Sequence, residues 1–180
     1  MSEVTQMISK IIQAEGGYVD HPHDKGGPTK WGITQKTLSL WRGKNMTKAD
    51  VQALTKFDAI SIYYFKYYVK PGINELAQPI QPIMLDMSIN HGHVNAIKML
   101  QRTLNRFGYL PDTGIDGLIG FNTLKAVREA LLELADIFIF ALVDTRIAFY
   151  KAIINQDPSQ KVFEKGWLAR AESFRPTKTA

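Results

Sequence analysis

The residues best suited to chemistry lie in one polar, glycine-rich stretch near the N-terminus. It runs from Glu15 to Thr34 and reads EGGYVDHPHDKGGPTKWGIT. Within it, Asp24 follows Glu15 at a distance of nine positions, and Thr29 follows Asp24 at a distance of five. Hydrolysis of a glycosidic bond needs a protonated acid and a second polar group that holds water or stabilises positive charge. The stretch contains residue types that fit both requirements.

The element before this stretch is predicted to be an amphipathic helix over residues 3–15. Its apolar residues recur at helical spacing, as Val4, Met7, Ile8, Ile11 and Ile12. Gly16 and Gly17 end the helix, so Glu15 is expected on its last turn, at the negative pole of the helix dipole. A carboxyl group there keeps its proton more readily, which suits Glu15 to the role of general acid.

The second polar group is expected to come from the loop itself. Asp24 lies in polar surroundings and should stay ionised, so the two carboxyl groups would differ in charge. Thr29 is a candidate for positioning a water molecule. Asp20 is the rival for the second carboxylate, and the spacing leaves that choice open.

The segment after the loop is predicted to be helical. Thr34 can cap a short helix that reaches about Trp41. Thr47 and Thr55 each precede an aspartate by three residues, the pattern of a capping box, and so open two further helices. The second of these carries five aromatic residues, Tyr63, Tyr64, Phe65, Tyr67 and Tyr68. Their rings either pack in the core or line a groove that binds sugars.

A polar stripe interrupts an apolar helix predicted over residues 83–90. Asp86 and Asn90 are four residues apart and share one face of it. Because buried polar groups need partners, this pair indicates either a structural network or the opposite wall of the site.

The His91-Gly92-His93 sequence is the predicted boundary between two domains, residues 1–92 and 93–180. The second domain is predicted to contain helices over 94–107, from about Asn122, over 133–154 and around Trp167. The alternation typical of strands is absent. The expected fold class is mostly α, with a short irregular or hairpin loop at the site.

Composition limits the classes of partner. The 180 residues carry a formal charge of +5, with a sequence pI near 9.3, which suits an anionic polymer. No basic cluster or RNA-binding motif favours a nucleic acid. Cysteine is absent, which excludes disulfides, thiolate nucleophiles and cysteine-ligated zinc. No stretch reaches about 18 apolar residues, so stable membrane insertion is not expected.

The stretch that begins at Glu15 resembles the signature of the glycoside hydrolase family 108 muramidases, which are similar to phage-type endolysins and lysozyme-like secretion activators. The family pattern is E-G-G-Y, a polar segment that ends in aspartate, G-G, and T-x-x-G-I-T. The matching residues are Glu15-Gly16-Gly17-Tyr18, Asp24, Gly26-Gly27, Thr29 and Gly32-Ile33-Thr34. His21 and His23 depart from the acidic residues more common in the family, which would alter the pH dependence.

The remainder of the chain extends the resemblance. Asp86, Asn90 and Gly92 are similar to a D-x-x-x-N-x-G helix end beside the family's cleft. The second half resembles the predicted peptidoglycan-binding domain that accompanies the family. Its markers are Leu100-Gln101, Asp116-Gly117, Ile119-Gly120, Thr123-Leu124, Arg146, Tyr150, Gly166-Trp167 and Arg170.

The resemblance implies a lysozyme-like muramidase that hydrolyses the β-1,4 bond between N-acetylmuramic acid and N-acetylglucosamine. Glu15 would be the catalytic acid, while Asp24 and Thr29 would place water or stabilise charge. The implied partner is the glycan strand of peptidoglycan, and no cofactor or metal is needed. The candidates for lining the groove are Tyr18, Asp20, Trp31, Asp86, Asn90 and His91.

Glu3 stands where a signal peptide would carry positive charge, and no long apolar region follows it. We therefore expect a monomer without a signal peptide, made in the cytoplasm. It would act at the cell wall or in the periplasm after release, and the resemblance implies a holin-like route.

Three alternatives use the same residues. A lytic transglycosylase also works with one glutamate, but transfers the muramoyl 6-hydroxyl instead of water. A non-catalytic peptidoglycan-binding or secretion-assisting protein would keep the fold without the acid. The histidine pairs at 21 and 23 and at 91 and 93 could, with Asp24, assemble a zinc site. The loop from Asp112 to Asp116 has too few acidic oxygens for calcium.

Overall fold

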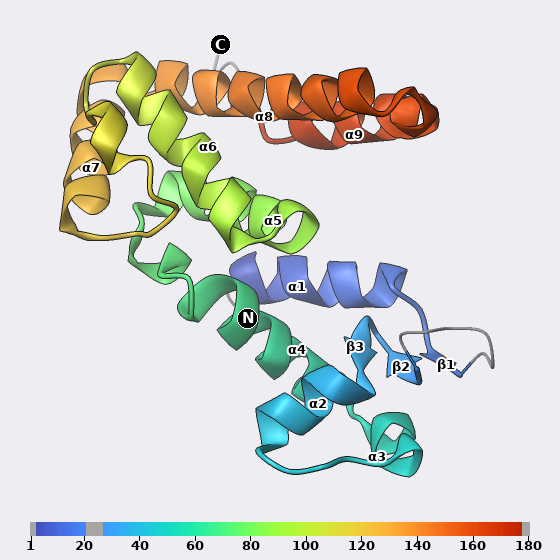
Figure 1. Ribbon diagram of the computed structural model, residues 1–180. Coiled ribbons are helices and arrows are strands. Elements are labelled where there is room, and N and C mark those ends of the chain that lie inside the picture. The colour runs from blue at the N-terminus through green and yellow to red at the C-terminus, as the bar shows by residue number, and fades with distance from the viewer. Residues whose placement is uncertain (1–2, 21–26, 178–180) are drawn as a thin grey trace. The chain divides into compact units, whose positions relative to one another are not determined.

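The computed structural model describes residues 3–20 and 27–177, and it is mostly α-helical, as the sequence predicts (Figure 1). The chain divides into two compact units, Met1–Lys70 and Pro71–Ala180. Within the described residues, no helix is long and apolar enough to cross a membrane.

The first unit combines helices with a small sheet. Its α-helices are α1 (Glu3–Ala14), α2 (Gln35–Arg42), α3 (Lys48–Ala53) and α4 (Lys56–Tyr64). A π-helical turn over Phe65–Val69 continues α4. The strands are β1 (Tyr18–Val19), β2 (Thr29–Lys30) and β3 (Ile33–Thr34).

The three strands form an antiparallel sheet in the order β1-β2-β3. Tyr18 pairs with Lys30 across β1 and β2, and Lys30 pairs with Ile33 across β2 and β3. Only Trp31 and Gly32 separate β2 from β3, and their φ angles are 49° and 73°. Positive φ at both central positions is what a two-residue hairpin with native twist requires. The expected hairpin at the site is therefore present.

Polar caps define where the helices of the first unit begin. The Thr34 hydroxyl accepts a hydrogen bond from the Thr37 amide at 3.1 Å and opens α2. Thr47 with Asp50, and Thr55 with Asp58, complete the two predicted capping boxes. Such caps are worth about 1 kcal/mol each, because they satisfy amides that the helix leaves free.

The core of the first unit lies between α1 and α4. Helix α1 buries Val4, Ile8 and Ile12, the apolar stripe seen in the sequence, and packs on α4. Helix α4 contributes Ile62 and Tyr63. Burial of each large aliphatic side chain stabilises the fold by about 1.5–3 kcal/mol. This packing fixes the end of α1, from which Glu15 emerges.

The second unit is a helical assembly. Its α-helices are α5 (Gln81–His91), α6 (His93–Arg106), α7 (Phe121–Leu134), α8 (Asp136–Gln156) and α9 (Glu164–Glu172). Short 3-10 turns cover Ile73–Glu75, Gln78–Ile80, Asp112–Gly114 and Pro158–Phe163. Helix α5 packs on α6, α6 on α8, and α8 on α9, which lies along it in Figure 1.

One predicted helix boundary is displaced. The long apolar helix expected from about residue 133 begins at Asp136. Ala135 adopts a positive φ of 47° and separates α7 from α8. A positive φ is sterically costly for alanine. The sequence has neither glycine nor proline at this break, so the sequence pattern does not mark its position.

Candidate active site

Glu15 stands one residue beyond α1, with its side chain exposed to solvent. Its amide donates a hydrogen bond to the carbonyl of Ile11 at 3.1 Å, so the residue completes the last turn. Gly16 then reverses the chain with a φ of 84°. Its carbonyl accepts a hydrogen bond from the Trp31 amide at 3.3 Å. That bond ties the β2–β3 hairpin to the end of α1 and so places it beside Glu15.

The Glu15 carboxylate and the Tyr63 hydroxyl converge over Gly32. A Cβ atom built on Gly32 would overlap the Tyr63 hydroxyl and lie 3.4 Å from Oε2 of Glu15. Tyr63 is a buried residue of α4, only 5% exposed. Its burial, and secondly the charge of Glu15, raise the pKa of the Tyr63 hydroxyl. The hydroxyl therefore keeps its proton and remains a hydrogen-bond donor beside the carboxylate.

The sequence pattern alone does not distinguish Tyr63 from the other four aromatic residues of its segment. A buried core tyrosine and a tyrosine that reaches a site occupy the same kind of position in a helical pattern. Gly32 entered the prediction only as part of the G-I-T motif. The structure adds its role, which is to leave room where a side chain would stand.

Thr29 lies on the central strand of the sheet, half-buried, paired with Val19 on one side and Thr34 on the other. Its hydroxyl donates to the Gly27 carbonyl at 3.2 Å, and its oxygen can still accept a hydrogen bond. Asp24, together with His21 and His23, lies outside the described residues. The roles predicted for Asp24 and Thr29 stay predictions.

Asp20 is exposed and already has a partner. Lys48 lies 3.0 Å from its Oδ2 atom, and the Tyr18 hydroxyl lies 3.5 Å from the same atom. The hydrogen bond and the charge of Asp20 raise the pKa of Lys48. Trp31, the third candidate for lining the groove in this unit, is half-buried, with the Lys30 ammonium 4.7 Å from its ring centroid.

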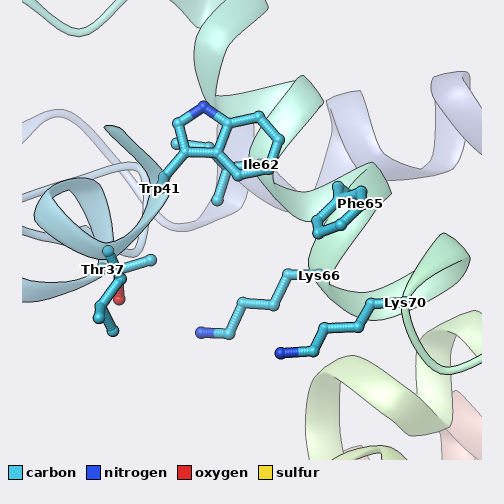
Figure 2. A pocket seen from close by; sticks show the side chains of 7 residues that line it. Thr37, Trp41, Ile62, Phe65, Lys66 and Lys70 are labelled. Atoms are coloured by element: carbon cyan, nitrogen blue, oxygen red, sulfur yellow. The ribbon is translucent and has the colours of Figure 1, made fainter. Parts of the chain in front are cut away.

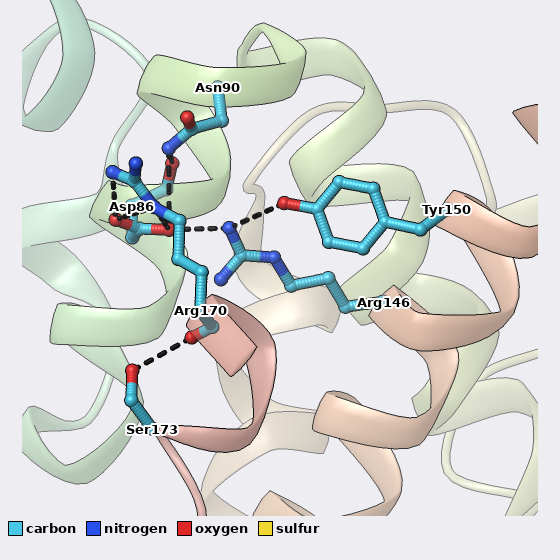
Figure 3. A network of polar contacts seen from close by, with 6 residues as sticks. All are labelled: Asp86, Asn90, Arg146, Tyr150, Arg170 and Ser173. Carbon is cyan, nitrogen blue, oxygen red and sulfur yellow. Dashed lines mark hydrogen bonds and ion pairs between the residues drawn. The ribbon is translucent and has the colours of Figure 1, made fainter. Parts of the chain in front are cut away.

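The other three candidates belong to the second unit, where Asp86 is the centre of a buried network (Figure 3). Arg170 donates to its carboxylate at 2.7 Å, and Arg146 forms a second ion pair with it. Asn90 donates to the Asp86 carbonyl at 2.7 Å, and Arg146 also donates to the Tyr150 hydroxyl at 3.1 Å. The carboxylate thus links α5, α8 and α9. This arrangement agrees with the first of the two readings of the Asp86–Asn90 pair, a buried structural network.

His91 is partly buried at the end of α5 against two rings of α8. The ring centroids of Phe149 and Tyr150 lie 5.1 Å and 4.9 Å from its own. Burial, with a further contribution from the positive charge of Arg146, lowers the pKa of His91 to about 4. The imidazole is therefore neutral at neutral pH. In the described part of the chain, no group of three or more histidine or carboxylate residues is arranged to hold a metal.

Comparison with known proteins identifies both halves of the chain. Residues 8–92 match the family model described as glycosyl hydrolase 108, and residues 95–172 match a predicted peptidoglycan domain. The two matches meet between residues 92 and 95, whereas the compact units divide after Lys70.

A solved structure described as that of Brucella abortus SagA is similar to this chain, with a TM-score of 0.70 and 38% sequence identity. The similarity covers 96% of this chain and 91% of that one. A search of curated proteins found no match. Identity at this level along nearly the whole length, together with the family match across the Glu15 loop, confirms the resemblance read from the sequence. The chain belongs to the glycosyl hydrolase 108 family, and is a glycoside hydrolase that acts on peptidoglycan.

Proposed function

We propose that this protein is an N-acetylmuramidase that hydrolyses the β-1,4 bond between N-acetylmuramic acid and N-acetylglucosamine. The observation that carries the proposal is the Glu15 carboxylate, solvent-accessible at the end of α1, with the Tyr63 hydroxyl also close to Gly32. A carboxyl group that can reach a polymer in solution, and that rigid elements hold in place, meets the geometric need of a general acid.

In the proposed reaction, the Glu15 carboxyl group gives its proton to the glycosidic oxygen as the C1–O bond breaks. Positive charge develops on the muramic acid ring, and water attacks C1. Asp24 and Thr29 are proposed to hold that water or to stabilise the charge. Tyr63 does not touch the reacting atoms in this scheme. Its hydroxyl lies close enough for the charge of Glu15 to raise its pKa, and it is proposed to act as a positioning residue.

Glu15→Gln tests the proposal, because the amide keeps the shape of the side chain and cannot deliver the proton. We expect the release of reducing ends from purified peptidoglycan to fall by about 10²–10⁴-fold, the usual contribution of a general acid. Glu3→Gln is the matched control, since Glu3 is an exposed glutamate at the other end of α1. Circular dichroism should show the same helical content for both variants.

The products separate the proposed reaction from its nearest rival. Mass spectrometry should detect reducing muropeptides that have gained water. Anhydro-muropeptides would instead identify a lytic transglycosylase. A Glu15→Gln protein that digests peptidoglycan at the original rate would rule out Glu15 as the acid, and absence of any product would favour a binding protein.

A further inference from the structure

The first unit carries an apolar pocket that the proposed reaction does not use. It has a volume of about 200 Å³ and lies between α2 and the segment formed by α4 and the π-helical turn. The Trp41 and Phe65 rings, with centroids 5.4 Å apart, and the buried side chain of Ile62 form its apolar surface (Figure 2). Trp41 and Phe65 remain 37% and 45% exposed, so a ligand can reach both rings.

Two lysines make this pocket electropositive. Lys66 and Lys70 line it, and Figure 2 shows their side chains extending in the same direction below the rings. No acidic residue lines the pocket, and no ion pair joins either ammonium group to another described residue, while the Lys66 ammonium lies 5.0 Å from the centroid of the Tyr67 ring. Two like charges that lie close together repel each other, and a bound anion removes that repulsion. The pocket therefore suits a ligand that combines a carboxylate with a small apolar group.

The pocket and the proposed acid are supported by the same elements. Ile62, which faces the pocket, directly precedes Tyr63, whose hydroxyl, like the Glu15 carboxylate, lies close to Gly32. Helix α2, which carries Trp41, begins directly after β3 and the hairpin that holds Gly32. The pocket and the hydroxyl near Glu15 are therefore formed by consecutive residues of α4.

We propose that this pocket binds the peptide stem of peptidoglycan. The stem is attached to N-acetylmuramic acid and carries alanine methyl groups together with free carboxylates. The methyl groups would pack on Trp41 and Phe65 while a carboxylate binds Lys66 and Lys70. A hollow of this size with two cations fits one short peptide better than a membrane surface. The inference rests on the proposed function, because the stem comes to this pocket only if Glu15 acts beside a muramic acid residue.

The binding test uses the full chain and the synthetic peptide L-Ala-γ-D-Glu-meso-diaminopimelate, titrated by NMR. We expect saturable binding with shifts in the Trp41 indole resonance. The double variant Lys66→Gln/Lys70→Gln should weaken binding by about tenfold or more, because charge-assisted contacts to a carboxylate are lost. The control Lys10→Gln/Lys36→Gln removes the same charge from exposed residues outside the pocket and should bind as the original does.

A second measurement compares digestion of intact peptidoglycan with digestion of glycan strands stripped of peptide by an amidase. The Lys66/Lys70 double variant should lose about tenfold in rate on the intact polymer and retain its rate on stripped strands. Because the substituted lysines are exposed, the fold is not at risk, and Trp41→Ala provides an independent variant of the same pocket.

Several outcomes would overturn the stem-binding proposal. These are equal affinity for the peptide in all variants, equal loss of rate on both polymers, or no saturable binding by the original protein. Binding to phosphatidylglycerol vesicles that requires Lys66 and Lys70, without peptide binding, would also overturn it in favour of a lipid. If the protein releases no product from any peptidoglycan, the proposed function fails, yet the peptide titration still decides the ligand of the pocket.

Discussion

At the residue scale, Gly32 controls how closely Glu15 and Tyr63 approach the backbone. We expect Gly32→Ala to reduce both stability and activity, because its Cβ would overlap the Tyr63 hydroxyl and the buried ring cannot withdraw. The left-handed φ of 73° adds a penalty of about 1 kcal/mol for any side chain. Together the destabilisation should be about 2–3 kcal/mol, with a fall in activity of about tenfold or more. Urea unfolding and reducing-end release measure the two effects.

Gly43 provides the matched control for this substitution. Its φ of 67° is similar, and a Cβ there would meet nothing within 4 Å. Gly43→Ala should therefore show only the backbone penalty and keep its activity. Adding Tyr63→Phe to Gly32→Ala removes the overlapping hydroxyl, so part of the lost stability should return. Equal destabilisation at Gly32 and Gly43 would contradict the steric role assigned to Tyr63.

Single residues also show what the sequence could and could not reveal of the site. The place of Glu15 at a helix end was predictable because a glycine pair after an apolar stripe marks a helix end. Tyr63 was not, because its approach to Glu15 depends on how α4 packs against α1, and no local pattern encodes that packing. Asp86 was predictable as a polar group that needs partners, but Arg146 and Arg170 lie 60 and 84 residues away in the chain.

At the element scale, the contact between α5 and α8 predicts a dependence of stability on pH. The pKa of His91 is about 4 in the folded protein, against an ordinary value of 6.5. Between these values the unfolded chain binds the proton and the folded chain does not, so the free energy of unfolding decreases as the pH falls through this window. The facing charges are Arg146 and Arg170, which oppose protonation, and Asp86, which favours it.

We expect the loss between pH 7 and pH 4 that is due to His91 to be about 2 kcal/mol, after a discount for the exposed part of the ring. Urea unfolding at both pH values measures it. His91→Phe keeps an aromatic ring on Phe149 and Tyr150 and should show a smaller decrease. The same substitution at the exposed His93 should not change the decrease. Identical pH dependence in the original protein and His91→Phe would refute this account.

The helices themselves were largely predictable, for reasons visible in each. The capping boxes at Thr47 and Thr55 begin α3 and α4 as expected, because the cap chemistry is local. The strands were not predictable individually, since each has only two residues and shows no alternation. The boundary between α7 and α8 was predicted near residue 133, whereas α8 begins at Asp136, because alanine favours helix and does not mark the break at Ala135.

At the scale of the whole molecule, the two proposed divisions of the chain differ by one helix. The sequence motif at residues 91–93 and the family matches place α5 with the first half, whereas the compact units place it with the second. Helix α5 buries six consecutive residues from Ile83 to Ser88 and packs on α6. It also supplies Asp86 to Arg146, which is fully buried.

We therefore expect a fragment of residues 71–180 to fold alone and a fragment of residues 93–180 not to. The shorter fragment would leave the buried Arg146 charge without its carboxylate, at a cost of about 3–5 kcal/mol. It would also expose the face of α6 that α5 covers. Thermal unfolding followed by circular dichroism, with the full chain as reference, measures cooperativity in both fragments. A cooperative transition in residues 93–180 would instead support the boundary at residue 92.

The π-helical turn over Phe65–Val69 has a consequence for the divergence of related sequences. Its closing bond, from the Lys70 amide to the Phe65 carbonyl at 2.8 Å, spans one residue more than an α-helical bond. Deletion of one residue would replace this bond with an α-helical one over the same turn, so the residues that follow would keep nearly the same direction about the axis. Two lysines three residues apart still share one face of an α-helix. A relative one residue shorter here should therefore keep the paired cations, so a single gap in an alignment at this turn is compatible with the same pocket.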